Sequence, residues 1–288
     1  MNDWSTWLQG ALYTLPLAGV VTWWLWRGGY LRRDAMASGP SRDVAVSLLD
    51  LGLAVLLMLA GGLAAQALLA GVMASRPGEA GQGGAASAWA ALVVQALSLG
   101  PAALVLVGRA MQAEAGLRRS GLVPRWPGRD AAWGVLSLVA AIPLATAVSL
   151  VVSGLSLALG IETPMIGHEV LQRMRDEASA RALALMIVSA VVVAPVLEEC
   201  VFRGLLQTAM LRVWGEARRW WIVLASSVIF AGIHASVGAW QALPTLMLLG
   251  VVWGYVYERT GSLWPGIVSH AGFNAYNVAL ALLVMPQA

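Results

Sequence analysis

The feature that most constrains the fold is a series of eight apolar runs, each near the roughly 20 residues that an α-helix needs to cross a membrane. The runs lie at about 7–26, 46–74, 87–108, 131–160, 182–211, 220–239, 241–257 and 264–285. Charged residues make up only 11% of the chain, whereas about a quarter of the residues in a soluble domain are charged. The sequence therefore predicts an all-α, polytopic transmembrane helix bundle with about eight spans.

Arginine placement predicts how this bundle is oriented. All 18 basic residues are arginines, and cytoplasmic loops carry the excess of positive charge in membrane proteins. With the N-terminus outside, 13 arginines fall in inner loops, four fall in outer loops, and Arg203 lies within a span. This imbalance predicts a multi-pass protein of a bacterial-type plasma membrane with both termini outside. Orientation also explains the net charge of +3, so we expect no nucleic-acid partner.

Three ionisable residues lie together inside the fifth apolar run, in the stretch APVLEECVFRGLLQ. Each such residue near the centre of a span is disfavoured by about 2.5–3.5 kcal/mol on insertion scales. Glu199 and Arg203 are four residues apart, so on a helix they share a face and can pair. Glu198 points about 100° away from Glu199 and needs a partner from another helix. The three residues predict either a buried ionic link between helices or a functional site.

Histidines favour the functional interpretation. Two of the three histidines, His234 and His270, lie inside later predicted spans, and Asn274 shares a helical face with His270. The first four spans hold no comparable acid, arginine or histidine at depth. We therefore expect a hydrated catalytic centre within the C-terminal four helices.

The segments EECVFR, FAGIH and HAGFN resemble, in order and approximate spacing, the EExxxR, FxxxH and HxxxN motifs of the CPBP intramembrane endopeptidases. This family includes the type II CAAX prenyl endopeptidases and the Abi proteins of bacteriocin processing and self-immunity. The resemblance covers about residues 182–280. Together with the four N-terminal apolar runs, it divides the chain into N-terminal transmembrane helices and loops over 1–181, about four helices in number, and a catalytic helical core over 182–288. The implied site residues are Glu198, Glu199, Arg203, His234, His270 and Asn274.

The resemblance also implies a role for each residue. Glu198 acts with His234 on a water molecule, which becomes the nucleophile that attacks a peptide bond. His270 and Asn274 stabilise the oxyanion that develops on the scissile carbonyl, and the remaining acid and arginine support the site. Donors that are fixed in advance are strongest where water is sparse, so this arrangement is physically coherent.

A metal-dependent mechanism is the alternative. Glu198, His234 and His270 would be a sufficient zinc ligand set, with water as the fourth ligand. No HExxH helix is present in the sequence. Arg203 lies one turn from Glu199, and its positive charge disfavours the binding of a divalent cation nearby. The favoured interpretation therefore requires no cofactor, with zinc as the alternative.

The leading functional hypothesis is an intramembrane endopeptidase whose partners are membrane lipid and a membrane-associated peptide or lipidated protein. Its substrate would be of the prenylated CAAX type or bacteriocin-like. One alternative is a proton-coupled transporter that uses the same groups as a relay, although no paired halves are evident in the sequence. The other is an immunity or scaffold membrane protein without catalysis.

Overall fold

The computed structural model describes residues 4–37, 39, 46–75, 85–113, 116–124, 126–162, 169–177, 179–236 and 238–283. The N-terminal part forms α1 (Trp4–Arg27), α2 (Leu48–Ser75), α3 (Ala85–Met111), α4 (Gly116–Arg119), α5 (Pro127–Ala158) and α6 (Glu169–Asp176). A continuous rod follows, made of α7 (Ala180–Val188), the π-helical η1 (Ser189–Val193), α8 (Ala194–Glu199), the π-helical η2 (Cys200–Gln207) and α9 (Thr208–Trp214). The rest forms α10 (Arg219–Ile233), α11 (Leu243–Thr260), α12 (Trp264–Leu283) and the short 3₁₀ turns η3 (Glu216–Arg218), η4 (His234–Ser236) and η5 (Trp240–Ala242). The prediction of an all-α bundle is confirmed.

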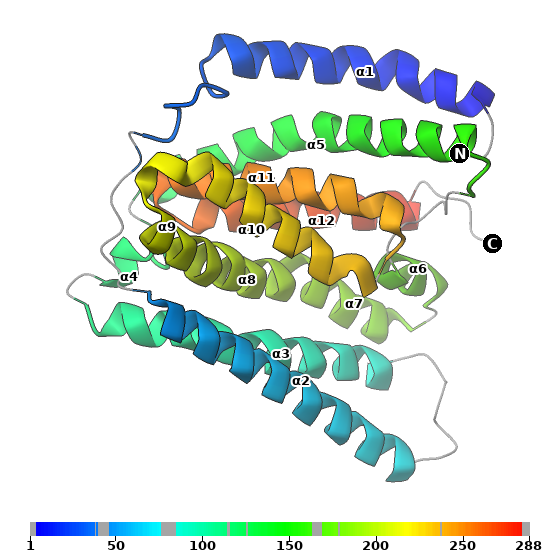
Figure 1. Ribbon diagram of the computed structural model, residues 1–288. Helices are drawn as coiled ribbons and strands as arrows, with labels where there is room; N and C mark the ends of the chain where they lie inside the picture. The colour runs from blue at the N-terminus through cyan, green and yellow to red at the C-terminus, as the bar shows by residue number, and fades with distance from the viewer. Residues whose placement is uncertain are drawn as a thin grey trace.

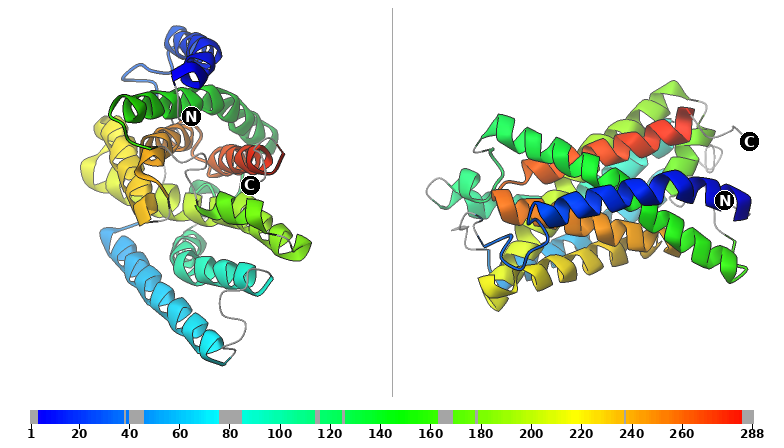
Figure 2. Two further views of the ribbon diagram at one scale, coloured as in Figure 1. Left: turned by 90° about the vertical axis from the view of Figure 1, so that its right-hand side faces the viewer. Right: turned by 90° about the horizontal axis from the view of Figure 1, so that it is seen from above.

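The C-terminal helices form the centre of the bundle, and the N-terminal helices flank them (Figures 1 and 2). On one side α5 packs against α11 and α12 and is itself covered by α1. On the other side α3 packs against α7 and η2, with α2 outside it. The N-terminal helices therefore cover two sides of the group formed by the rod, α11 and α12, where the sequence predicts the site, while α10 packs on α11 and η2.

Each of the eight predicted spans coincides with a long helix or with the rod. Within the described residues, five segments are long and apolar enough to cross a membrane: Leu48–Val72, Ala88–Met111, Pro127–Ala158, Ala180–Trp214 and Glu216–Ser236. The other three predicted spans are α1, α11 and α12, with 24, 18 and 20 residues. α1 begins and α12 ends at the same end of the bundle (Figures 1 and 2). The count of eight and the outside location of the termini stay predictions.

Proline and glycine determine where several helices begin and end. α5 starts at Pro127, whose missing N–H costs nothing in the first turn of a helix. α11 ends at Thr260, and the following Gly261 has a φ of +64° and donates its N–H to the Tyr257 carbonyl. Because this left-handed conformation favours glycine, the chain can leave α11 and turn directly into α12.

Small residues let α2 and α3 approach closely, as expected where helices pack without a hydrophobic driving force. A Cβ atom added at Gly61 of α2 would collide with the backbone carbonyl of Leu97 in α3. We expect Gly61→Ala to destabilise the protein by about 1–3 kcal/mol, because backbone atoms must move apart. Gly52→Ala is the matched control, since its Cβ meets nothing within 4 Å. Thermal unfolding in detergent should show a lower midpoint for Gly61→Ala only; equal midpoints would contradict the prediction.

Candidate active site

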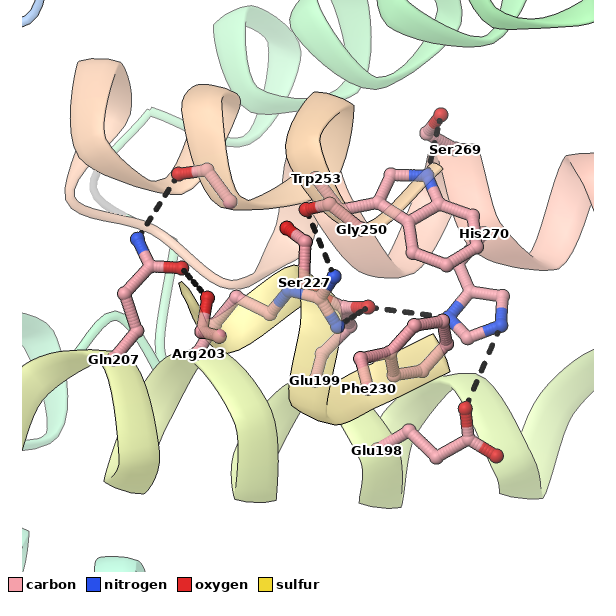
Figure 3. Close-up of polar contacts among 12 residues, drawn as sticks. Glu198, Glu199, Arg203, Gln207, Ser227, Phe230, Gly250, Trp253, Ser269 and His270 are labelled. Carbon is pink, nitrogen blue, oxygen red and sulfur yellow. Dashed lines mark hydrogen bonds and ion pairs between the residues drawn. The ribbon is translucent and has the colours of Figure 1, made fainter. Parts of the chain in front are cut away.

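Glu198 lies at the centre of a converging set of side chains from three elements. Its Oε2 atom is 4.0 Å from Nε2 of His234, which directly follows α10, and 3.8 Å from Nε2 of His270 in α12. Both distances exceed a direct hydrogen bond, and this buried oxygen has no hydrogen-bond partner among the described residues. Figure 3 shows Glu198 facing His270 across this gap. The structure thus brings the acid and both histidines around one point, where a small polar molecule would find partners on three sides.

The second ring nitrogen of each histidine is held in place. His234 Nδ1 lies 2.7 Å from the carbonyl oxygen of Phe230, which can only accept, so Nδ1 carries the proton. His270 Nδ1 lies 3.1 Å from Oε1 of Glu199 and donates to that carboxylate (Figure 3). In their neutral forms both rings therefore present an accepting Nε2 atom towards Glu198.

Glu199 and Arg203 form the ion pair that their four-residue spacing predicts. Arg203 Nη1 donates to Glu199 Oε1 at 3.1 Å, and Arg203 Nη2 donates to the Gly250 carbonyl in α11 at 3.1 Å. Both side chains are buried. Because the same carboxylate oxygen also accepts from His270, a continuous chain of contacts runs from Gly250 through Arg203 and Glu199 to the His270 ring.

Aromatic residues complete the surroundings, and one of them, Trp253, was not singled out by the sequence. Trp253 of α11 stacks on the His270 ring, with centroids 3.8 Å apart and planes 15° apart, and donates to Ser269 Oγ at 3.2 Å. The Arg203 guanidinium lies 5.0 Å from the centroid of Phe230 and 5.4 Å from that of Trp253. The chain has 14 tryptophans, and nothing in its sequence marks Trp253 as the fully buried one beside the site.

Asn274 makes a different contact from the one expected. Its Nδ2 atom donates to the Ala190 carbonyl at 2.8 Å. In the π-helical segment the Ala194 N–H bonds to the Ser189 carbonyl, and the next residue, Pro195, has no N–H to offer to Ala190. Asn274 therefore satisfies a carbonyl that the rod cannot satisfy itself, and it joins α12 to η1. Its role at the oxyanion stays a prediction.

The proposed ligand set for a metal has suitable donor types. Two imidazole nitrogens and a carboxylate oxygen suit zinc, and both imidazoles have the outer partners that zinc ligands commonly have. Among the described residues, however, no group of three or more His, Cys, Asp or Glu side chains is arranged to hold a metal ion. Whether the site holds zinc stays a prediction, and no step below passes through a metal.

Comparison with known proteins matches the segment that carries this site to a family. Residues 180–276 match the family described as type II CAAX prenyl endopeptidase Rce1-like. The chain is 30% identical over 102 residues to "Putative membrane peptidase YdiL" of Bacillus subtilis (strain 168), a match that covers 35% of this chain and 39% of that relative. No solved structure matches the chain. Residues 180–276, which carry all three motifs and the converging side chains, thus match the Rce1-like family, in agreement with the resemblance of the motifs to the CPBP endopeptidases.

Proposed function

We propose that this chain is an intramembrane endopeptidase in which Glu198, assisted by His234, activates a water molecule for attack on a peptide bond. The observation that carries the proposal is the unpartnered Glu198 Oε2 atom, flanked by the Nε2 atoms of His234 and His270 at 4.0 and 3.8 Å. Spacings of this size suit a bridging water molecule. Membership of residues 180–276 in a peptidase family supports the same reaction.

The donor and acceptor pattern gives the water its orientation. A water molecule at this point donates one hydrogen to Glu198 and one to His234 Nε2, which leaves an oxygen lone pair free to attack. As the new carbon–oxygen bond forms, Glu198 takes the proton, and it later delivers that proton to the leaving amine when the carbon–nitrogen bond breaks. His270, when protonated, donates from Nε2 to the oxyanion while Glu199 holds its other nitrogen. Together these steps use every polar contact described around Glu198.

The proposed substrate is a membrane-associated peptide, with a prenylated CAAX-type peptide as the first choice because of the family of residues 180–276. The side chains of His234 and Glu198 are 16% and 12% exposed, whereas that of His270 is 5% exposed. Access to Glu198 is therefore greatest from the side of His234, where α10 ends. We propose that the scissile bond enters from this side.

Cleavage in proteoliposomes tests the proposal. The probes are a farnesylated CAAX-type peptide with a fluorophore and a quencher on either side of the expected bond, and the same peptide without the farnesyl group. We expect the protein to cleave the farnesylated probe, whereas empty liposomes should not. Equal cleavage of both probes would remove the preference for prenyl groups, and cleavage of neither by folded protein would contradict the proposed activity.

Metal removal separates the two mechanisms. We expect purified protein to hold less than one equivalent of zinc and to keep its cleavage rate in 1,10-phenanthroline, because Glu198 and the two histidines activate water without a metal. Elemental analysis and the probe assay with and without chelator measure both quantities. Loss of activity in chelator with recovery on adding zinc would instead assign Glu198, His234 and His270 as ligands.

A further inference from the structure

Gln207, Glu258 and Arg219 form a second buried polar group, named here the Gln207 cluster, which the proposed chemistry does not use. Gln207 Nε2 donates to Glu258 Oε1 at 2.6 Å, and Arg219 Nη1 donates to Glu258 Oε2 at 2.8 Å. Gln207 and Glu258 are 0% exposed and Arg219 is 5% exposed. The cluster joins three elements, because Gln207 ends η2, Glu258 lies in the last turn of α11 and Arg219 begins α10.

Gln207 repeats, one turn further along the rod, the contact that Arg203 makes with α11. Arg203 Nη2 donates to the Gly250 carbonyl at 3.1 Å (Figure 3). Gln207 Nε2 donates to the Gly254 carbonyl, also at 3.1 Å. The two donors, Arg203 and Gln207, are four positions apart, and so are the two acceptor glycines, which is about one helical turn on each element. The two bonds together therefore fix how far α11 can slide along η2.

Glycine at both acceptor positions makes this close approach feasible. A Cβ at Gly254 would lie 2.8 Å from Gln207 Oε1, and a Cβ at Gly250 would lie 2.8 Å from Ser227 Cβ. Either side chain would push α11 away from its neighbours and lengthen the carbonyl contacts. η2 and α11 are thus close enough for side chains of η2 to donate hydrogen bonds to backbone carbonyls of α11.

The register of α11 matters for the site because this helix touches the reacting groups in two ways. Its Gly250 carbonyl anchors Arg203, which holds Glu199 and through it His270, and its Trp253 stacks on the His270 ring at 3.8 Å. A small slide of α11 would move both supports together. Displacement of a catalytic group by about 1 Å can cost roughly 100-fold in rate.

We propose that Gln207 is a positioning residue for the active site, which sets the register of α11 on η2 and thereby holds the Arg203, Glu199 and His270 chain in its working geometry. The inference rests on the proposed peptidase function. A buried ion pair such as Arg219–Glu258 is often no more stabilising than apolar residues of the same volume. Directional hydrogen bonds fix one register, whereas an apolar contact tolerates sliding, and this is the property that the site requires.

The first test is Gln207→Met, which keeps the length of the side chain but removes its donors. We expect kcat for the farnesylated probe to fall about 10- to 100-fold while KM stays unchanged, because the acid and histidines are misplaced but the substrate surface is not. Cys200 provides a readout that needs no activity, since it is the single cysteine of the chain, begins η2 and is buried. Its labelling by N-ethylmaleimide should become faster in the variant.

Asp50→Asn is the matched control, because Asp50 is a buried carboxylate whose side-chain hydrogen bonds within the described residues go to Ser47 and Arg109. Its Oδ1 atom lies 2.6 Å from Nε and from Nη2 of Arg109, which joins α2 to α3. We expect this variant to melt at a lower temperature with wild-type kcat and wild-type Cys200 labelling. If Gln207→Met behaves in the same way, Gln207 has only a structural role and the inference is overturned. If the wild-type protein cleaves no probe, the proposed function fails, and Cys200 labelling alone decides whether Gln207 sets the packing of η2.

A second variant covers the case in which Gln207→Met does not fold. In Gln207→Glu, a protonated carboxyl can still donate to Glu258, but two ionised carboxylates cannot share this buried site. The charged groups near position 207 are Glu258, Arg219 beyond it and Arg203 one turn away. Activity relative to wild type should therefore be highest at acid pH and fall as the pH rises. A pH profile parallel to that of the wild type would overturn the inference.

Discussion

Glu198→Gln should reduce kcat about 10²- to 10⁴-fold while the protein stays inserted and folded. Glutamine keeps the shape of the side chain but cannot take a proton from water. The Oε2 atom has no hydrogen-bond partner among the described residues, so its replacement breaks no hydrogen bond within them. The melting temperature should accordingly stay at or above that of the wild type, because a poorly solvated charge is removed.

The measurement is cleavage of the farnesylated probe together with thermal unfolding in detergent. Glu162→Gln serves as the control, because it removes the same charge from an exposed position four residues after the end of α5. It should leave both quantities unchanged. Cleavage at the wild-type rate by Glu198→Gln would exclude Glu198 as the base.

Arg203→Met should cause the largest loss of stability, about 3–5 kcal/mol, because it leaves Glu199 buried without its charged partner. Arg203 and Glu199 are both 1% exposed in their side chains, so water cannot replace the lost contact. Thermal and denaturant unfolding measure the loss. An unchanged midpoint would show that the ion pair does not hold the site together.

The double variant Glu199→Gln/Arg203→Met separates stability from activity. Removing both charges takes away the uncompensated carboxylate, so part of the lost stability should return. Activity should not return, since His270 Nδ1 then faces a neutral amide in place of the carboxylate it now contacts at 3.1 Å. A double variant with restored cleavage would show that the Arg203–Glu199 pair has no part in positioning His270.

The helices themselves could be predicted from the sequence because each apolar run is long enough to satisfy its own backbone in lipid. The residues at which the helices end were harder to predict from the sequence. The run 220–239 predicts one span that contains His234, whereas α10 ends at Ile233 and His234 begins a short 3₁₀ turn. Apolar residues cover all sides of such helices, so no polar face marks the position at which the helix stops or the direction in which it packs.

Side-chain chemistry allowed the convergence of Glu198, His234 and His270 to be predicted, since charged and polar groups inside a membrane need partners. The contacts that support them depend on helix register and could not be predicted in that way. Trp253 looks like any other tryptophan in sequence, and Gln207 looks like an ordinary polar residue near a helix end. The acceptor for Asn274 arises only because the π-helical turn before Pro195 leaves the Ala190 carbonyl without its usual donor.

The Ala190 carbonyl affects how the protein assembles in the membrane. Proline cannot supply an N–H in any surroundings, so when the rod enters the bilayer ahead of α12, Ala190 carries an oxygen with no donor from its own helix, a state that hydrocarbon penalises strongly. Asn274 ends that penalty when α12 arrives, one turn after His270 on the same helix. Packing of α12 against the rod therefore gives the Ala190 carbonyl its hydrogen-bond donor and brings His270 to the site in the same step. A molecule in which α12 has not yet packed lacks both Asn274 at Ala190 and His270 at Glu198.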